Sequence, residues 1–379
     1  MSIQVVPPAV LHQADKILFV AHLALGDFTY MEACFRAFHH AYPHIKIDIW
    51  VDELRRTYDF RQWESLKKYS LFSWLETVPY FHKMYKETYS PFVFSNSLRA
   101  AKTEQYPIVI AFGLSRRTYY ARLVRSISKK GFVVSIGKRY KPYDVFKRRT
   151  FERLDACLLD YPKDAMHISD IYATWFEQLF GLDICPADRI PHLVIPQIWT
   201  ADAEHRLQQW GLLGKRLRQK RLIFVNPFSK QDERSLSVEK ALQLITEMRQ
   251  LEQWRDSDFI LNTVPEKWDE TQAILACHPL MSQVFLFSAT ENFFQLPAIL
   301  EQCDLVISVE TAVMHLANAV KVPVIALMRQ LSPEWAPLDA ENSRIIMVEG
   351  RDDWVQSISL ERIINTLPSA VDMHWQVSS

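Results

Sequence analysis

The segment formed by residues 304–327 constrains the fold of this chain more than any other part of its sequence. Residues 305–309 are a continuous apolar run, which is typical of a strand buried on both faces of a parallel sheet. A helix is predicted to begin near Thr311, and residues 322–327 form a second buried run. This order predicts a strand–helix–strand unit whose polar residues, Glu310 and Thr311, lie where strand gives way to helix. Open α/β sheets bind anionic ligands, phosphates above all, at that edge.

The same alternation of strands and helices runs along both halves of the chain. The predicted strands are 17–21, 45–51, 108–112 and 132–136 in the first half, and 222–225, 259–264, 284–287, 305–309, 322–327 and 345–348 in the second. The predicted helices include 28–41, 116–129, 204–210, 238–251 and 294–303. Strands that alternate with helices indicate parallel sheets, so we predict an α/β chain of two Rossmann-like, doubly wound domains.

Length and interruptions of the pattern set the predicted domain limits. The 379 residues suit two domains, and Pro191 and Pro196 interrupt the alternation between them. We therefore predict an N-terminal domain over residues 1–195, a C-terminal domain over 196–355 and a final segment over 356–379. The aromatic-rich interval 60–105 does not divide into elements by its pattern, and we expect its rings to lie mostly in the core.

Composition excludes several classes of protein. Basic and acidic residues number 44 each, so net charge indicates no nucleic-acid partner. The five cysteines contain no C-x-x-C pair, which argues against a disulfide framework or a structural zinc site and fits a reducing cytoplasm. The start of the chain does not resemble a signal peptide, and no apolar run reaches the ~20 residues of a transmembrane helix. G-x-G-x-x-G and P-loop motifs do not occur.

Basic residues gather in one stretch of the first half. Between Arg116 and Arg149 there are twelve basic residues and one acidic residue, Asp144. One interpretation is an ordinary solvated surface. The other is a basic wall that faces phosphates, carboxylated sugars or an anionic membrane surface.

Three polar groups of residues are candidates for chemistry. Gly26 is predicted to make the tight turn after the first strand, and Asp27 either caps the next helix or acts as a general base. Ser229, Lys230 and Arg234 either contact a diphosphate or belong to an ordinary polar loop. In the third group, Glu310 could accept hydrogen bonds from sugar hydroxyls and Thr311 could bind phosphate. His315 is either a core histidine or a ligand-binding residue.

Two of these segments resemble known signatures. Leu25-Gly26-Asp27, followed by a helix and Ala41-Tyr42-Pro43, resembles the N-terminal signature of glycosyltransferase family 9, the ADP-heptose–lipopolysaccharide heptosyltransferases. The run Ser308-Val309-Glu310-Thr311-Ala312-Val313-Met314-His315, with Val322-Pro323-Val324 beyond it, is similar to that family's Ser-Val-Asp-Thr-Gly-x-x-His motif.

The resemblance implies a GT-B architecture, in which two Rossmann-like domains face a central cleft and the C-terminal segment crosses back to the first domain. It implies inverting transfer of heptose from ADP-heptose to a lipopolysaccharide inner-core acceptor of the lipid A–Kdo type, without a metal or a further cofactor. Asp27 would be the general base. The donor site would comprise Ser229, Lys230, Arg234, Glu310, Thr311, Ala312 and His315; the acceptor site would comprise Gly26, Arg116, Arg117, Lys138 and Arg139. We expect a cytoplasmic protein that docks peripherally at the inner face of the inner membrane.

Two departures from the family pattern bear on the donor. Glu310 replaces the usual Asp, and Ala312 replaces a Gly, so a longer acidic side chain and an added methyl group lie near the donor motif. These changes leave two alternatives open. One is transfer from another nucleotide sugar, such as a hexose donor, to a different glycan or protein acceptor. The other is binding of a glycolipid or nucleotide without catalysis.

Overall fold

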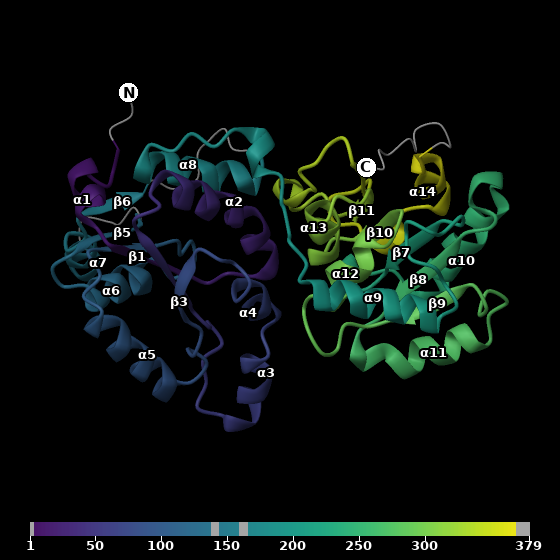
Figure 1. The fold of residues 1–379 in the computed structure, drawn as a ribbon, viewed down its shortest axis with the longest axis horizontal. Coiled ribbons are helices and arrows are strands. Elements are labelled where there is room, and N and C mark those ends of the chain that lie inside the picture. Colours follow the sequence, from purple (N-terminus) through teal and green to yellow (C-terminus); the bar gives the residue numbers. More distant parts are fainter. Residues whose placement is uncertain (1–3, 138–143, 159–165, 369–379) are drawn as a thin grey trace. The chain divides into compact units, whose positions relative to one another are not determined.

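A computed structural model describes residues 4–137, 144–158 and 166–368 of the chain. The chain divides into two compact units, Met1–Arg189 and Ile190–Ser379, hereafter the first and second units (Figure 1). The division falls at the start of the irregular stretch that precedes helix α9, and the boundary predicted after residue 195 falls within the same stretch. Among the described residues, no helix combines the length and apolar character needed to cross a bilayer.

The first unit is built on a six-stranded parallel sheet in the order β3-β2-β1-β4-β5-β6. Its strands are β1 Lys16–Ala21, β2 Lys46–Val51, β3 Phe81–Tyr85, β4 Ile108–Ala111, β5 Phe132–Ile136 and β6 Ala156–Leu158. Its helices are α1 Pro8–Gln13, α2 Leu25–Ala41, α3 Trp63–Lys67, α4 Ser70–Leu75, α5 Pro91–Thr103, α6 Arg117–Ile127, α7 Val145–Phe151 and α8 Ile168–Phe180.

Strand β1 packs on both of its faces, as its continuous apolar sequence predicts. On one face, Phe19 stacks within an aromatic cluster that includes Phe35 of α2 and Phe176 of α8, at ring-centroid distances of 5.1 and 5.8 Å. On the other face, Leu18 and Val20 join the core that α6 covers. Each aromatic pair of this kind contributes about 0.5–1.5 kcal/mol beyond the burial of its surface. The helices thereby hold the carboxyl end of β1 in a fixed position.

The second unit repeats this plan with the order β12-β11-β10-β7-β8-β9, again all parallel. Its strands are β7 Leu222–Asn226, β8 Asp258–Asn262, β9 Val284–Phe287, β10 Leu305–Val309, β11 Val324–Met328 and β12 Ser343–Met347. Its helices are α9 Gln197–Gln209, α10 Val238–Gln250, α11 Trp268–Ala276, α12 Gln295–Glu301, α13 Ala312–Ala319 and α14 Leu360–Thr366. The two doubly wound α/β domains predicted from the sequence are therefore present.

The C-terminal helix corrects one prediction. Ile358 and Ile363 are buried in the same hydrophobic core as Ile245 of α10 and Ile346 of β12, all within the second unit. The predicted crossing of residues 356–379 back to the first domain is therefore wrong for residues 356–368, because their apolar side chains complete the second core. Residues 369–379 lie outside the described part of the chain.

The strand order places a topological switch point in each sheet. In the first unit β1 lies between β2 and β4, and in the second unit β7 lies between β8 and β10. Chain connections leave these central strands toward opposite sides of the sheet. The space outside their carboxyl ends is where open α/β sheets bind ligands.

Candidate functional site

Asp27 lies at the switch point of the first unit, as the third residue of α2. Its Oδ2 atom accepts a hydrogen bond from the backbone N–H of Ala24 at 2.8 Å, which caps the helix. Its Oδ1 atom accepts a second hydrogen bond from the hydroxyl of Tyr172, in α8, also at 2.8 Å. The carboxylate is thus held by one local contact and one contact that is distant in sequence, and each oxygen keeps a lone pair for a ligand.

The electrostatics of Asp27 suit a base. Burial raises the pKa of its carboxyl above the ordinary value, while the hydrogen bonds from Tyr172 and Ala24 and the nearby His22 oppose that rise. A raised pKa brings a carboxylate closer to the working range of a general base.

The predicted tight turn at Gly26 is wrong. Gly26 is the second residue of α2, so it has helical backbone and does not make the turn after β1. The helix begins at Leu25, three residues before the predicted start at Phe28, because the Asp27 side chain caps the free N–H of Ala24.

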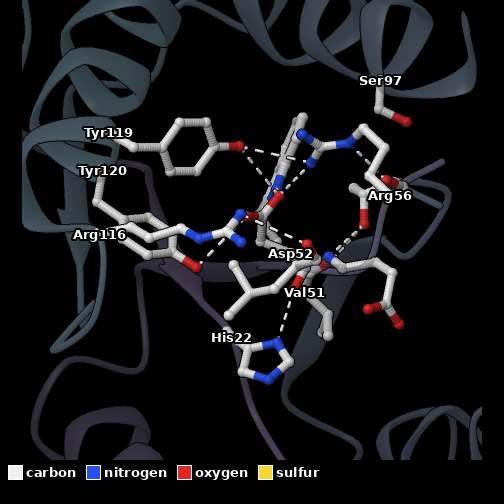
Figure 2. A network of polar contacts seen from close by, with 12 residues as sticks. His22, Val51, Asp52, Arg56, Ser97, Arg116, Tyr119 and Tyr120 are labelled. Atoms are coloured by element: carbon white, nitrogen blue, oxygen red, sulfur yellow. Dashed lines mark hydrogen bonds and ion pairs between the residues drawn. The ribbon is translucent and has the colours of Figure 1, made fainter. Parts of the chain in front are cut away.

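A buried polar network lies at the carboxyl end of β2, the strand next to β1 (Figure 2). At its centre is Asp52, whose Oδ1 accepts from Arg56 Nη2 at 2.6 Å and from the Tyr119 hydroxyl at 3.2 Å. Its Oδ2 accepts from the Tyr120 hydroxyl at 3.3 Å. Burial and the Asp52 charge raise the pKa of Tyr119 to about 12, so both tyrosines remain donors. This carboxylate therefore joins the chain after β2 to the first turns of α6.

The same network fixes the ring of His22. The backbone carbonyl of Asp52 accepts a hydrogen bond from His22 Nδ1 at 2.9 Å (Figure 2). Since a carbonyl can only accept, Nδ1 carries a proton, and in the neutral ring Nε2 keeps its lone pair.

Arg116 and Arg117, predicted to bind the acceptor, lie at the start of α6. Arg116 adopts the left-handed backbone conformation, with φ of 53°, and its exposed guanidinium donates one long hydrogen bond of 3.4 Å to the carbonyl of Leu54. Arg117 instead donates to the carbonyls of Leu114 and Gly137 at 3.0 and 2.9 Å. Both line an open hollow of about 330 Å³ together with Leu114, Thr118 and Tyr119. Lys138 and Arg139 lie outside the described residues.

Three of the seven other described basic residues of this stretch pair with local acids. Arg125 pairs with Asp155 at 2.5 Å, and Arg148 pairs with Glu152 at 2.7 Å. Lys147 pairs with Asp144. These pairs favour the solvated-surface interpretation for Arg125, Lys147 and Arg148, whereas Arg116 is exposed and has no acidic partner among the described residues.

In the second unit, Thr311 is the N-cap of α13, and its Oγ1 accepts from the N–H of Val313 at 3.3 Å. The Asn226 side chain, at the end of β7, donates to Thr311 Oγ1 and to Ser308 Oγ, both at 3.0 Å. The Asn262 side chain, at the end of β8, donates to Asn226 Oδ1 at 2.8 Å. A row of hydrogen bonds therefore crosses the switch point and fixes the start of the helix.

Glu310 and Arg234 bind each other in this structure. Glu310 Oε1 lies 3.1 Å from Arg234 Nη1, and Oε2 accepts from the backbone N–H of Arg329 at 3.3 Å. The Glu310 side chain is 5% exposed and that of Arg234 is 31% exposed. Burial raises the pKa of Glu310, and the charge of Arg234 opposes the rise. The pair thus puts a guanidinium beside the donor motif, held by the acid that departs from the family pattern.

The other residues predicted to bind the sugar donor make fewer contacts with one another. The backbone N–H of Ser229 donates to Ser235 Oγ at 3.0 Å, and Lys230 is exposed on the same loop. Ala312 is the first residue of α13, and its backbone adopts the helical conformation. His315 is buried, 4% exposed, with its ring 6.4 Å from that of Trp335. No group of three or more side chains suited to a metal occurs in the described ranges.

Sequence reasoning missed several residues of these sites: His22, Asp52, Arg56, Tyr172, Asn226 and Asn262. One signal could have found three of them. Asn226, Asn262 and Asp52 each end or directly follow an apolar strand, where a polar side chain lies at the ligand-binding edge. Nothing local indicates Tyr172, because its partner Asp27 is 145 residues away in the sequence.

Part of the second unit matches the model of a known protein family. The family model described as glycosyltransferase family 9 (heptosyltransferase) matches residues 264–355, which include Glu310, Thr311, Ala312 and His315. The resemblance inferred from the motifs is therefore confirmed. No curated protein matches the sequence.

Solved structures match 92–93% of the chain. A glycosyltransferase family 9 protein from Veillonella parvula superposes with a TM-score of 0.69 at 17% identity, covering 93% of this chain and 95% of that one. The ADP-heptose lipopolysaccharide heptosyltransferase II of E. coli gives 0.64 at 14% identity, with coverage of 92% and 96%. The E. coli heptosyltransferase WaaC with ADP gives 0.58 at 14% identity, again with coverage of 92% and 96%. At these identities the likeness shows the fold, and it confirms the predicted two-domain GT-B architecture.

Proposed function

We propose that this chain, which carries the motif and fold of glycosyltransferase family 9, transfers a sugar from a nucleotide-sugar donor to a hydroxyl of an acceptor glycan. In its specific form, the donor is ADP-heptose and the acceptor is a lipopolysaccharide inner core of the lipid A–Kdo type. The observation that carries the proposal is the arrangement of Thr311, Glu310 and Arg234 at the switch point of the second unit, next to the anion-favouring start of α13.

Donor binding would use complementary charge and hydrogen bonding. A diphosphate presents only acceptor oxygens, and the free N–H groups of α13, the Thr311 hydroxyl and the guanidinium of Arg234 are donors. Lys230, on the loop after β7, would add a second cation. Similar proteins support this choice of ligand, since WaaC has been solved with ADP and with ADP-2-deoxy-2-fluoro heptose.

The transfer would be a single inverting displacement. The acceptor oxygen attacks the anomeric carbon while Asp27 takes the hydroxyl proton. The bond from that carbon to the diphosphate oxygen breaks, and the diphosphate leaves with the electron pair. Donors around the diphosphate stabilise the charge that develops there, without a metal ion. Tyr172 and the Ala24 N–H hold the Asp27 carboxylate in place for this step.

Acceptor recognition is assigned to the first unit. A lipid A–Kdo acceptor is rich in phosphate and carboxylate groups, and the exposed Arg116 beside the open hollow offers a cation to such a group. Peripheral attachment to the inner face of the inner membrane belongs to the same proposal, because this acceptor is anchored there.

One observation favours a second candidate, transfer from a different nucleotide sugar. Glu310 reaches Arg234 with its longer side chain, and Ala312 adds a methyl group at the first position of α13. Both changes lie in the donor motif, so they bear on which sugar or base the site accepts while leaving the reaction class unchanged.

Thermal denaturation with ADP, UDP, GDP and CDP tests the proposal. A nucleotide at about 100 times its dissociation constant stabilises the protein that binds it by about 2.7 kcal/mol, which raises Tm by several degrees. We expect ADP to raise Tm. A shift with UDP, GDP or CDP in its place would contradict the ADP assignment and support the second candidate. No shift with any of them would contradict the glycosyltransferase proposal.

A further inference from the structure

Each hydrogen bond in the row that crosses the switch point of the second unit has an identifiable donor and acceptor. Parallel register aligns Ser308 of β10 with Asn226 of β7, and Asn262 ends the next strand, β8. Asn226 is 2% exposed and Ser308 is fully buried. Water is therefore excluded from most of the row, and each polar atom in it has to be satisfied by its neighbours.

The donors and acceptors along the row determine the orientation of the Asn226 side-chain amide. Its Oδ1 accepts from Asn262 Nδ2 at 2.8 Å, so both hydrogens of its Nδ2 are directed to Ser308 Oγ and Thr311 Oγ1. Ser308 uses its own hydroxyl proton on the carbonyl of Val309, at 2.8 Å. Ser308 is thus satisfied as donor and as acceptor.

The Thr311 hydroxyl is then left with a proton to donate. Its oxygen accepts from Asn226 and from the N–H of Val313, which uses both lone pairs. The one oxygen near its proton within the row is Ser308 Oγ, at 3.4 Å, which is beyond the usual range for O–H···O bonds. Thr311 is half-buried at the start of α13, where a bound ligand would supply the acceptor that this proton lacks within the row.

From these donor and acceptor assignments we propose that Asn226 is a positioning residue of the donor site. Because Asn226 donates to Thr311 Oγ1, the Thr311 hydroxyl can only donate its own proton to a ligand, and a diphosphate oxygen, which can only accept, suits that role. The inference rests on the function proposed above, and it extends the site from the family motif to the ends of β7 and β8. Asn226 does not touch the ligand in this scheme and acts through Thr311.

Asn226→Asp tests this assignment with little change of shape. The introduced carboxylate can only accept hydrogen bonds, so the Thr311 hydroxyl donates to it and no longer to the ligand. The negative charge of the carboxylate also lies about one hydrogen-bond length from that hydroxyl. We expect ADP affinity, measured by calorimetry on the full chain at about pH 8, to fall by about 10- to 100-fold. A buried carboxyl has a raised pKa, so acidification toward about pH 5 should protonate it and restore part of the affinity.

A control variant separates positioning from loss of structure. Asn318→Asp places the same change in α13, where Asn318 is buried and contacts Ser343 and Asp339. It should lower Tm but show no recovery of ADP affinity on acidification. Glu310, Arg234, Lys230 and His315 are present in the wild type and in both variants, so ADP affinities are compared between proteins at each pH.

A double-mutant cycle tests whether Asn226 acts through Thr311. Asn226→Ala and Thr311→Val should each weaken ADP binding, and the combined variant should be little worse than Thr311→Val alone. Additive losses, or an Asn226→Asp variant that binds ADP like the wild type at every pH, would overturn the inference while leaving the proposed function intact. A wild type that binds none of ADP, UDP, GDP and CDP would overturn both.

Discussion

Replacing Arg234 with alanine should destabilise the second unit in a pH-dependent way. The substitution leaves the Glu310 carboxylate, whose side chain is 5% exposed, with the backbone N–H of Arg329 as its remaining partner. The opposite substitution, Glu310→Gln, leaves a guanidinium that is 31% exposed and that water can still solvate. The structure therefore predicts that Arg234→Ala lowers the free energy of unfolding more than Glu310→Gln does.

The magnitude follows from the geometry. At 3.1 Å and an effective dielectric constant of about 20, the gross attraction between the two charges is about 5 kcal/mol. Removing one partner of a buried pair costs about 3–5 kcal/mol, and the partial exposure of Arg234 reduces this to about 2 kcal/mol. Glu310→Gln should cost less than about 1 kcal/mol. For a unit of this size, about 2 kcal/mol corresponds to a Tm decrease of about 4–8 °C.

The sign of the pH effect comes from Glu310. Its pKa in the folded protein is already raised above the ordinary 4.5, and removing Arg234 removes a charge that lowers it. A carboxyl with a raised folded pKa binds its proton more tightly when folded, so stability is lost as pH rises above 4.5 toward the folded value. The Tm deficit of Arg234→Ala relative to wild type should therefore grow across that range.

Scanning calorimetry of the wild type and both variants, without nucleotide and at several pH values, measures these differences. The double variant Arg234→Ala/Glu310→Gln is the control and should lose the added pH dependence. The reasoning is refuted if Glu310→Gln costs as much as Arg234→Ala, or if the deficit of Arg234→Ala is the same at every pH.

Three further predictions concern the first unit. Tyr172→Phe removes a hydrogen bond that lowers the pKa of Asp27, so the acidic limb of the kcat/KM profile for transfer should move to higher pH; an unmoved limb would separate Tyr172 from the base. Asp27→Asn should lower transfer by about 100- to 10,000-fold while the Tm shift caused by ADP is retained, and near-normal transfer would exclude Asp27 as the base. Asp52→Ala leaves Arg56 Nη2 and two tyrosine hydroxyls without this carboxylate, although Arg56 Nε keeps the Thr88 carbonyl, and should destabilise the first unit by about 3–5 kcal/mol in urea unfolding. Arg55→Ala, which removes the exposed partner of Glu53, should cost about 0–1 kcal/mol.

The central strands were predicted well from the sequence because strands that are buried on both faces consist of continuous apolar runs. The predicted bounds of β5 and β10 coincide with the observed ones, and so do those of the edge strand β9. Strands β3 and β6 were missed because β3 contains His82 and Lys83 and β6 has only three residues, so neither forms an apolar run of strand length. Their edge position is not the reason, since the edge strands β9 and β12 were predicted. The aromatic interval 60–105 contains α3, α4, β3 and α5, with Trp74 buried but Phe60 and Phe92 exposed.

Among the site residues, those indicated by the local sequence were predicted, and contacts between distant segments were not. Thr311 was predicted because a strand end and a helix start are adjacent in sequence. Its contact with Asn226 was not predictable locally, since the register of β7 beside β10 brings together residues 85 positions apart. The pairing of Glu310 with Arg234 likewise depends on side-chain reach, which a motif does not specify.

The most direct test of the proposed function is the mass of a lipid A–Kdo acceptor after incubation with ADP-heptose and the full chain. We predict that the wild type increases the acceptor mass by one heptose residue and that Asp27→Asn gives almost no such product. An acceptor left unchanged by the wild type would contradict the proposed heptosyl transfer, and equal product from both proteins would contradict the role of Asp27.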